Sequence, residues 1–275
     1  FVKLVLLFAF LTMLSCSKKE AIYISGSTTV LPVITQAAEA FKADHTDFNI
    51  IINAGGSGVG INQLGEHKTE IAMASRDITD SEINKYPNTT FNPISIGKDA
   101  VVPVVSSEIY DAGVTALTLN DIARIYSGEI SNWKELNGPD KAILCIDKEA
   151  SRGTRHIFMN AIFGDKNAEA KGADLVLGSN NEEQTALVQS DAAIGMLSHA
   201  WLSKDVKGLG IIQNNQNTVH PSLENIVNGS YPISRDLTII TNGKPEGKLK
   251  QFINFILSQS GQRIVQKSGY VKINS

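Results

Sequence analysis

Short apolar runs alternate with amphipathic helical patterns along almost the whole of this 275-residue chain. Short apolar runs bounded by turn residues are typical of strands, whereas apolar residues at three- and four-residue spacing are typical of helices. Strands are predicted at Ile22–Ser25, Phe48–Asn53, Ile71–Ala74, Ile94–Ile96, Ala100–Val105, Ile143–Ile146, Ala193–Leu197 and Leu237–Thr241. Helices are predicted at Leu31–Asp44, Gly58–Gly65, Leu119–Ser127, Thr154–Ile162, Asn181–Gln189 and Gly247–Ser258, with a further turn from Gln262. This order of elements predicts an α/β architecture.

The length of the chain allows two α/β lobes. With 42% hydrophobic residues, the chain can bury a full core. The apolar run Val101–Val105 contains Pro103, which favours an edge or a crossover position over a central strand. We expect a first lobe of residues 21–97 plus 223–275 and a second lobe of residues 98–222. Two such crossings leave a cleft that can close around a ligand.

The N-terminus predicts an export signal and a lipid anchor. Residues 2–14 are almost entirely apolar, too short a stretch for an ordinary spanning helix but suited to a signal-peptide core. Ser15 directly before Cys16 is similar to the lipobox of bacterial lipoproteins, in which the cysteine is lipidated. We expect residues 1–15 to be a signal peptide and residues 16–20 a lipidated tether in the cell envelope, periplasmic or on the outer face of a membrane. A plain secretory signal or an uncleaved anchor is the alternative.

The ionisable and nucleophilic residues do not point to catalysis or to nucleic-acid binding. The net charge is −3 and no basic run is present, so no nucleic-acid partner is expected. Cys145 lies in a continuous apolar run and is expected to be a buried core residue. The five histidines show no metal-binding spacing; they are His45, His67, His156, His199 and His220. We therefore expect no metal, no cofactor and no enzymatic activity.

Residues Ser25–Pro32 (SGSTTVLP) form a turn of small hydroxyl residues between a predicted strand and a predicted helix. Free N–H groups at a helix start, together with hydroxyl groups and the helix dipole, favour a small anion. One such turn is weak evidence, because Ser and Thr are ordinary helix N-caps. The chain repeats the arrangement, and the repetition is what indicates a site.

A glycine-rich turn, Asn53–Gly60 (NAGGSGVG), also joins a predicted strand to a predicted helix. Its glycines allow the backbone to approach a ligand closely and to form a concave nest of N–H groups. The turn has neither the Gly-Lys-Ser/Thr of a P-loop nor the G-x-G-x-x-G of a dinucleotide fold. Val59 also excludes a nucleophile elbow at Ser57.

Two further turns follow predicted strands and contain an arginine. Residues Ser151–Thr154 (SRGT) open a predicted helix. Arg76 offers a bidentate fork to a tetrahedral oxyanion, with an ion pair to Asp77, Asp80 or Asp99 as the alternative. Because α/β sheets bind ligands at the carboxyl ends of their strands, the four turns together predict one oxyanion site.

Four segments resemble the motifs of a known family. Ser25–Pro32 is similar to a G-S/A-T-x-x-x-P opening, and Gly55–Gly60 to a second glycine turn. Ile71–Arg76 is similar to an IGxASR stretch, and Leu117–Leu136 to the most diagnostic segment. These motifs resemble the PstS family, the phosphate-binding proteins of the phosphate ABC importer. The resemblance covers nearly everything after Cys16. It implies the type II periplasmic-binding-protein fold, with two α/β lobes joined by two crossover strands and the ligand cleft between them.

The resemblance also implies a set of phosphate ligands. They are hydroxyl or backbone donors of Ser27, Thr28, Thr29, Ser57, Gly153 and Thr154. The chain departs from the family at Arg152, where a serine is usual, so either Arg152 or Ser151 contacts the anion. Lys148 stands where an arginine is usual, and it lacks the planar fork.

The position of Arg76 bears on how phosphate is told from sulfate. Longer family members have an aspartate there, which accepts the proton of hydrogen phosphate, whereas shorter members often have arginine. If Arg76 is a ligand, the rejection of sulfate requires another acceptor. We expect Asp77 to be that acceptor.

The sequence therefore predicts a monomeric, non-enzymatic receptor that binds inorganic phosphate between two lobes. The closed form is expected to dock on the membrane permease subunits of an ABC importer. Three alternatives stay open: a receptor for sulfate, molybdate or tungstate, a phosphate-ester hydrolase, and an interaction protein whose anion site is vestigial.

Overall fold

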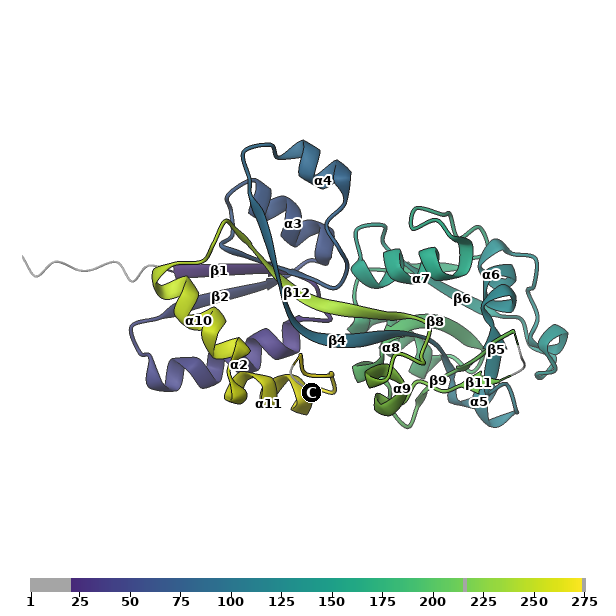
Figure 1. Ribbon diagram of the computed structural model, residues 1–275. Coiled ribbons are helices and arrows are strands. Elements are labelled where there is room, and N and C mark those ends of the chain that lie inside the picture. The colour runs from purple at the N-terminus through teal and green to yellow at the C-terminus, as the bar shows by residue number, and fades with distance from the viewer. Residues whose placement is uncertain (1–20, 215–216, 274–275) are drawn as a thin grey trace, which may run out of the picture.

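Two long strands, β4 (Phe91–Ser106) and β12 (Ser234–Asn242), join two lobes that lie side by side (Figure 1). The computed structural model describes residues 21–214 and 217–273. The predicted signal peptide, the tether and the lipidated Cys16 lie outside the described residues.

The first lobe packs helices on both sides of three parallel strands (Figure 1). The strands are β1 (Ala21–Gly26), β2 (Asn49–Ala54) and β3 (Ile71–Ala74). The helices are α2 (Leu31–Asp44), α3 (Ser57–Gly65), α4 (Asp80–Lys85), α10 (Gly247–Leu257) and α11 (Gln259–Lys267). β3 is a continuous apolar strand because both of its faces are buried.

The second lobe has the same strand–helix alternation. Its strands are β5 (Ala116–Thr118), β6 (Leu144–Lys148), β7 (Leu175–Leu177), β8 (Ala193–Ser198), β9 (Val206–Gly208), β10 (Gly210–Ile212) and β11 (Thr218–Val219). Its helices are α5 (Ser107–Asp111), α6 (Leu119–Ser127), α7 (Gly153–Phe163), α8 (Asn180–Gln189) and α9 (Leu223–Val227), with 3₁₀ turns η1 (Trp133–Leu136) and η2 (His199–Trp201).

The two lobes share one nine-stranded sheet. Its order is β2-β1-β3-β12-β4-β8-β6-β7, with β9 also paired to β4, and a separate small sheet has the order β11-β10-β5. β12 runs antiparallel to both β3 and β4, so it continues the sheet from one lobe into the other. The predicted strands Ile94–Ile96 and Ala100–Val105 are both parts of β4. The prediction that the strand containing Pro103 crosses between the lobes is confirmed, because β4 pairs with β12 in its first part and with β8 in its second.

Each lobe has its own hydrophobic core. One core gathers residues between Ile22 and Ile96 with others from Leu237 to Tyr270, beside a small separate cluster around Ile61 and Leu64. A second core gathers residues between Ala100 and Ile233 together with Val271. Ile226, Tyr231 and Ile233, which precede β12, belong to the second core.

Trp133 lies in the segment Leu117–Leu136 and is completely buried in the second core. Its indole Nε1 donates a 2.8 Å hydrogen bond to the carbonyl of Ala192, directly before β8. The segment therefore fastens the outer helices of the second lobe to its sheet.

We expect Trp133→Phe to lower the free energy of unfolding by about 2–3 kcal/mol, because it leaves a cavity and an unpaired buried carbonyl. Urea unfolding followed by circular dichroism measures this loss. The half-buried Trp201 provides the matched control, and Trp201→Phe is expected to cost about 1 kcal/mol or less. Equal losses in the two variants would contradict the anchoring role.

Candidate functional site

Residues from both lobes enclose one small pocket where the strand ends meet. The pocket is lined by Ser27, Thr28, Thr29, Gly56, Ser57, Ser75, Lys148, Arg152, Gly153, Thr154, Gly178, Ser179 and Asn180. These residues directly follow or end β1, β2, β3, β6 and β7, so the carboxyl ends of parallel strands from both lobes converge here. The pocket volume is about 10 Å³, room for one very small group.

The first-lobe wall is a network of three serine hydroxyls. The Ser27 hydroxyl donates to Ser75 Oγ at 3.0 Å, and Ser57 Oγ lies 3.3 Å from the same oxygen. The backbone N–H of Ser75 donates to Ser57 Oγ at 3.1 Å, and that of Thr29 to Ser27 Oγ at 3.2 Å. These bonds tie the turns after β1, β2 and β3 into one rigid surface.

Helix starts add partial positive charge at the same place. α3 begins at Ser57 and α7 begins at Gly153, and neither first turn has an acidic side chain. The first N–H groups of a helix have no partner within the helix, so those of Gly153 and Thr154 are donors for a ligand. The pocket therefore combines hydroxyl groups from both lobes with the helix N–H donors of Gly153 and Thr154.

The two lobes touch closely beside the pocket. The N–H of Gly58 in the first lobe donates to the carbonyl of Ser151 in the second at 3.0 Å. A Cβ added at Gly153 would lie 2.5 Å from Ser75 Oγ and would also collide with Ser57 Oγ. Only glycine therefore allows the lobes to meet in this arrangement.

Each of the two cations that line the pocket is paired with a carboxylate. Lys148 forms an ion pair with Glu183 in which both side chains are buried. Burial lowers the pKa of the Lys148 ammonium, and the adjacent Glu183 carboxylate opposes that shift. Arg152 pairs with Glu149, its Nε donating at 2.9 Å, and its side chain covers Gly56 of the opposite lobe so closely that a Cβ there would lie 2.8 Å from Arg152 Cδ.

Three residues expected at the site do not line this pocket. Arg76 forms two hydrogen bonds with the carboxylate of Glu82, at 2.9 and 2.7 Å, and lies beside a neighbouring hollow together with Ser151. The alternative ion pair of Arg76 with Asp77, Asp80 or Asp99 is wrong. Glu82, which closes a capping box at the start of α4, lies within reach of the Arg76 guanidinium instead. The Asp77 side chain is exposed and lines a different hollow. In the described parts of the chain, no carboxylate lines the pocket.

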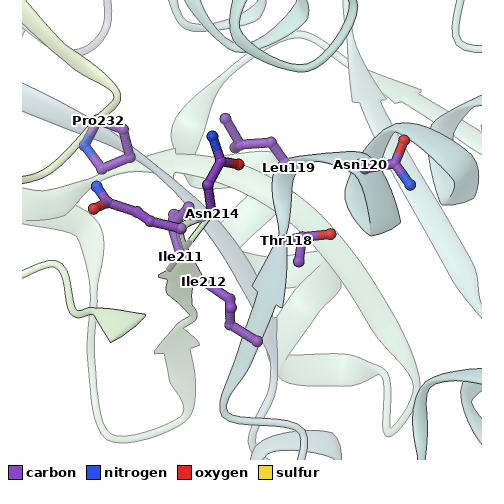
Figure 2. A pocket seen from close by; sticks show the side chains of 8 residues that line it. Thr118, Leu119, Asn120, Ile211, Ile212, Asn214 and Pro232 are labelled. Carbon is purple, nitrogen blue, oxygen red and sulfur yellow. The ribbon is translucent and has the colours of Figure 1, made fainter. Parts of the chain in front are cut away.

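A larger hollow of about 1050 Å³ lies on the second lobe (Figure 2). It is lined by Thr118, Leu119, Asn120, Ile211, Ile212, Gln213, Asn214 and Pro232, none of which is charged. At the start of α6 beside it, Thr118 and Asp121 form a capping box that engages the N–H groups of these two residues. This hollow therefore offers an anion no cationic side chain.

The chemistry of the pocket is that of anion binding. Among the residues that the structure describes, no group of three or more His, Cys, Asp or Glu side chains could hold a metal ion. Cys145 is buried as expected, and burial raises the pKa of its thiol far above the ordinary value.

Within residues 21–214 and 217–273, no helix is long and apolar enough to span a bilayer.

Comparisons with known proteins agree with this geometry. A family model described as a PBP superfamily domain matches residues 16–260. The phosphate-binding protein PstS of Borreliella burgdorferi is 33% identical over 266 residues, covering 94% of this chain and 91% of its own length. The chain belongs to the PstS family.

Solved structures of similar proteins share the fold. A phosphate ABC transporter substrate-binding protein from Clostridium perfringens, solved with bound phosphate, superposes with a TM-score of 0.82 at 32% identity, covering 93% of this chain and 100% of that one. An ABC-type phosphate transport receptor from Vibrio cholerae superposes with a TM-score of 0.73 at 30% identity, covering 91% and 99%. The fold is the type II periplasmic-binding-protein fold.

The structure adds pocket residues that the PstS-family motifs did not suggest. Ser75 is the neighbour of Arg76, and it, not Arg76, lines the pocket. Gly178, Ser179 and Asn180 follow the short strand β7, and Ser179 is the N-cap of α8. The signal for this turn was the same as for the others, a hydroxyl residue at a helix start, but β7 was not predicted.

His156 stabilises the turn that leads into α7. Its ring Nε2 lies 2.9 Å from the carbonyl oxygen of Ala150. Burial, with the nearby charge of Arg76, lowers the pKa of His156 from 6.5 to about 4. Between these two pH values the unfolded chain binds a proton that the folded chain does not, so this histidine makes the fold less stable as the pH falls.

We expect His156→Gln to reduce the acid sensitivity of the fold while leaving its behaviour at neutral pH nearly unchanged. The measurement compares thermal unfolding midpoints at neutral pH and near pH 4.5. The exposed His220 provides the control, and His220→Gln is expected to leave the difference between the two midpoints as in the wild type. An unchanged pH dependence in His156→Gln would refute this role.

Proposed function

We propose that this chain binds inorganic phosphate in the interlobe pocket and delivers it to the membrane permease of an ABC importer. The observation that carries the proposal is the convergence of hydroxyl and helix N–H donors from both lobes on one small enclosed pocket. The names of the similar proteins, and the phosphate bound in the Clostridium perfringens structure, support phosphate as the ligand.

The size of the pocket favours an inorganic anion over a phosphate ester. The pocket is small and lies between two lobes that are in contact, which suits a compact anion without an organic substituent. The described lining also provides no carboxylate, cysteine or histidine to act as nucleophile or base. A receptor therefore fits the pocket better than a hydrolase.

The proposed ligand contacts come from both lobes. They are Ser27, Thr28, Thr29 and Ser57 from the first lobe, and Lys148, Arg152, Gly153 and Thr154 from the second, to which we add Ser75 and Asn180. Their positions support this assignment, whereas those of Arg76, Asp77 and Ser151 do not. Without a carboxylate in the lining, any acceptor for the phosphate proton is a hydroxyl or a carbonyl oxygen.

The lobes are proposed to close around phosphate by bending at β4 and β12, and the closed form is proposed to dock on the permease as a monomer. We further propose that lipidated Cys16 holds the protein at the outer face of a membrane, with residues 1–15 as its signal peptide. The lobe boundary at residues 97 and 98 agrees with the two hydrophobic cores. The return to the first lobe is proposed to lie within β12.

Isothermal titration calorimetry of the purified protein tests the proposal. We expect phosphate to bind with a micromolar or lower dissociation constant, about −8 kcal/mol or better. Parallel titrations use sulfate and molybdate, and p-nitrophenyl phosphate serves to detect turnover. Tighter binding of sulfate or molybdate would assign the pocket to another oxyanion, turnover would indicate a hydrolase, and the absence of any binding would indicate a vestigial site.

We expect Gly153→Ala to lower phosphate affinity by about tenfold to a hundredfold, because the added methyl group collides with two serine hydroxyls of the other lobe. Small-angle scattering is expected to show a smaller phosphate-induced decrease in radius of gyration than in the wild type. Ser151→Ala lies in the same turn but outside the pocket, and its affinity is expected to stay within about threefold. Wild-type affinity in Gly153→Ala would show that the lobes need not meet here.

A further inference from the structure

Arg235 on β12 is a buried cation that none of the anion-binding motifs contains. Its side chain is 2% exposed and its partner Asp99, on β4, is fully buried. The guanidinium Nε and Nη2 both donate to Asp99 Oδ2, at 3.0 and 2.7 Å. Arg235 does not itself line the pocket, yet it lies directly behind it.

The remaining donors of Arg235 reach pocket residues of both lobes. Nη1 donates to Thr154 Oγ1 at 3.0 Å, and Nη2 to Thr29 Oγ1 at 3.3 Å. Nη1 also donates to the carbonyl of Ser75 at 3.3 Å. One side chain on a crossover strand is therefore bonded to the turns after β1, β3 and β6.

These bonds determine which way the threonine hydroxyls point. A hydroxyl has one hydrogen and two lone pairs, and a guanidinium can donate but never accept. Thr29 Oγ1 accepts from Arg235 and also from Asn180 Nδ2 at 3.2 Å, so both of its lone pairs are used. Thr154 Oγ1 accepts one hydrogen bond, from Arg235. The hydrogens of both hydroxyls are left for a ligand oxygen.

We propose that Arg235 is a positioning residue for anion binding, which holds the hydroxyls of Thr29 and Thr154 as donors facing the pocket. The inference rests on the proposed function, because it concerns the same anion site. Thr29 belongs to the first lobe and Thr154 to the second, so Arg235 reaches both only when the lobes are together. Asp99 fixes the position of the Arg235 guanidinium and is therefore part of the same arrangement.

A double-mutant cycle in the purified protein tests this role by calorimetry with inorganic phosphate. Arg235→Lys keeps a charge beside Asp99 but removes the fork, and Thr154→Val removes the hydroxyl that the fork orients. We expect each single variant to lose about tenfold or more in affinity. Because both changes affect the Thr154 hydroxyl, the double variant is expected to lose clearly less than the product of the two single losses.

Arg155 offers a matched control. It forms a buried pair with Asp147, the two side chains being 9% and 6% exposed, but its Nη2 also bonds the carbonyl of Ala168 and it does not line the pocket. Arg155→Lys is expected to lower stability while leaving phosphate affinity within about threefold. An Arg235→Lys variant that binds as the wild type does, or losses that multiply in the double variant, would overturn the positioning role.

The wild-type titration separates this inference from the proposed function, because a wild type that does not bind phosphate refutes both before any variant is made. If Arg235→Lys does not fold, a crystal structure of the unmodified protein with phosphate tests the positioning role instead. The inference requires Thr29 Oγ1 and Thr154 Oγ1 each within hydrogen-bond distance of both Arg235 and a phosphate oxygen. Either hydroxyl turned away from the anion would overturn it.

Discussion

The buried ion pair between Asp99 and Arg235 joins the two strands that connect the lobes, and the anion pocket is built on it. Removing two charges from water is costly, so such a pair persists only where further hydrogen bonds satisfy both groups. Here the Ser198 hydroxyl donates to Asp99 Oδ1 at 2.9 Å, while Arg235 donates to pocket residues of both lobes. The arrangement of the lobes and the orientation of the ligand donors therefore depend on the same interaction.

The pocket is rich in donors although the charges around it cancel. Three cations in or behind it are each paired with one carboxylate: Lys148 with Glu183, Arg152 with Glu149 and Arg235 with Asp99. A bound anion therefore meets oriented hydroxyl and N–H dipoles more than net positive charge. Dipoles that are fixed before the ligand arrives stabilise an anion without reorganising. This explains how a chain with a net charge of −3 can contain an anion site.

The parts of the site that could be predicted from the sequence are those whose signal is local. The turns at Ser25–Pro32 and Ser151–Thr154 combine a strand end, hydroxyl residues and a helix start within a few positions. The sequence could not decide between Ser75 and Arg76, because the choice depends on Glu82 closing a capping box six residues further on. The role of Arg235 could not be predicted from the sequence, because its partner Asp99 lies 136 positions away. Their pairing follows only from the antiparallel register of β4 and β12.

The departure at Arg152 can be understood from its surroundings. An arginine in place of a small hydroxyl residue needs space and a counter-charge, and the structure provides both. Gly56 has a φ of 91°, a conformation that already favours glycine. Because Gly56 has no side chain, the Arg152 side chain has room to lie over it. Glu149 lies three residues before Arg152, in the turn between β6 and α7, and neutralises it. The substitution therefore exchanges a hydroxyl donor for a covered guanidinium without adding net charge to the pocket.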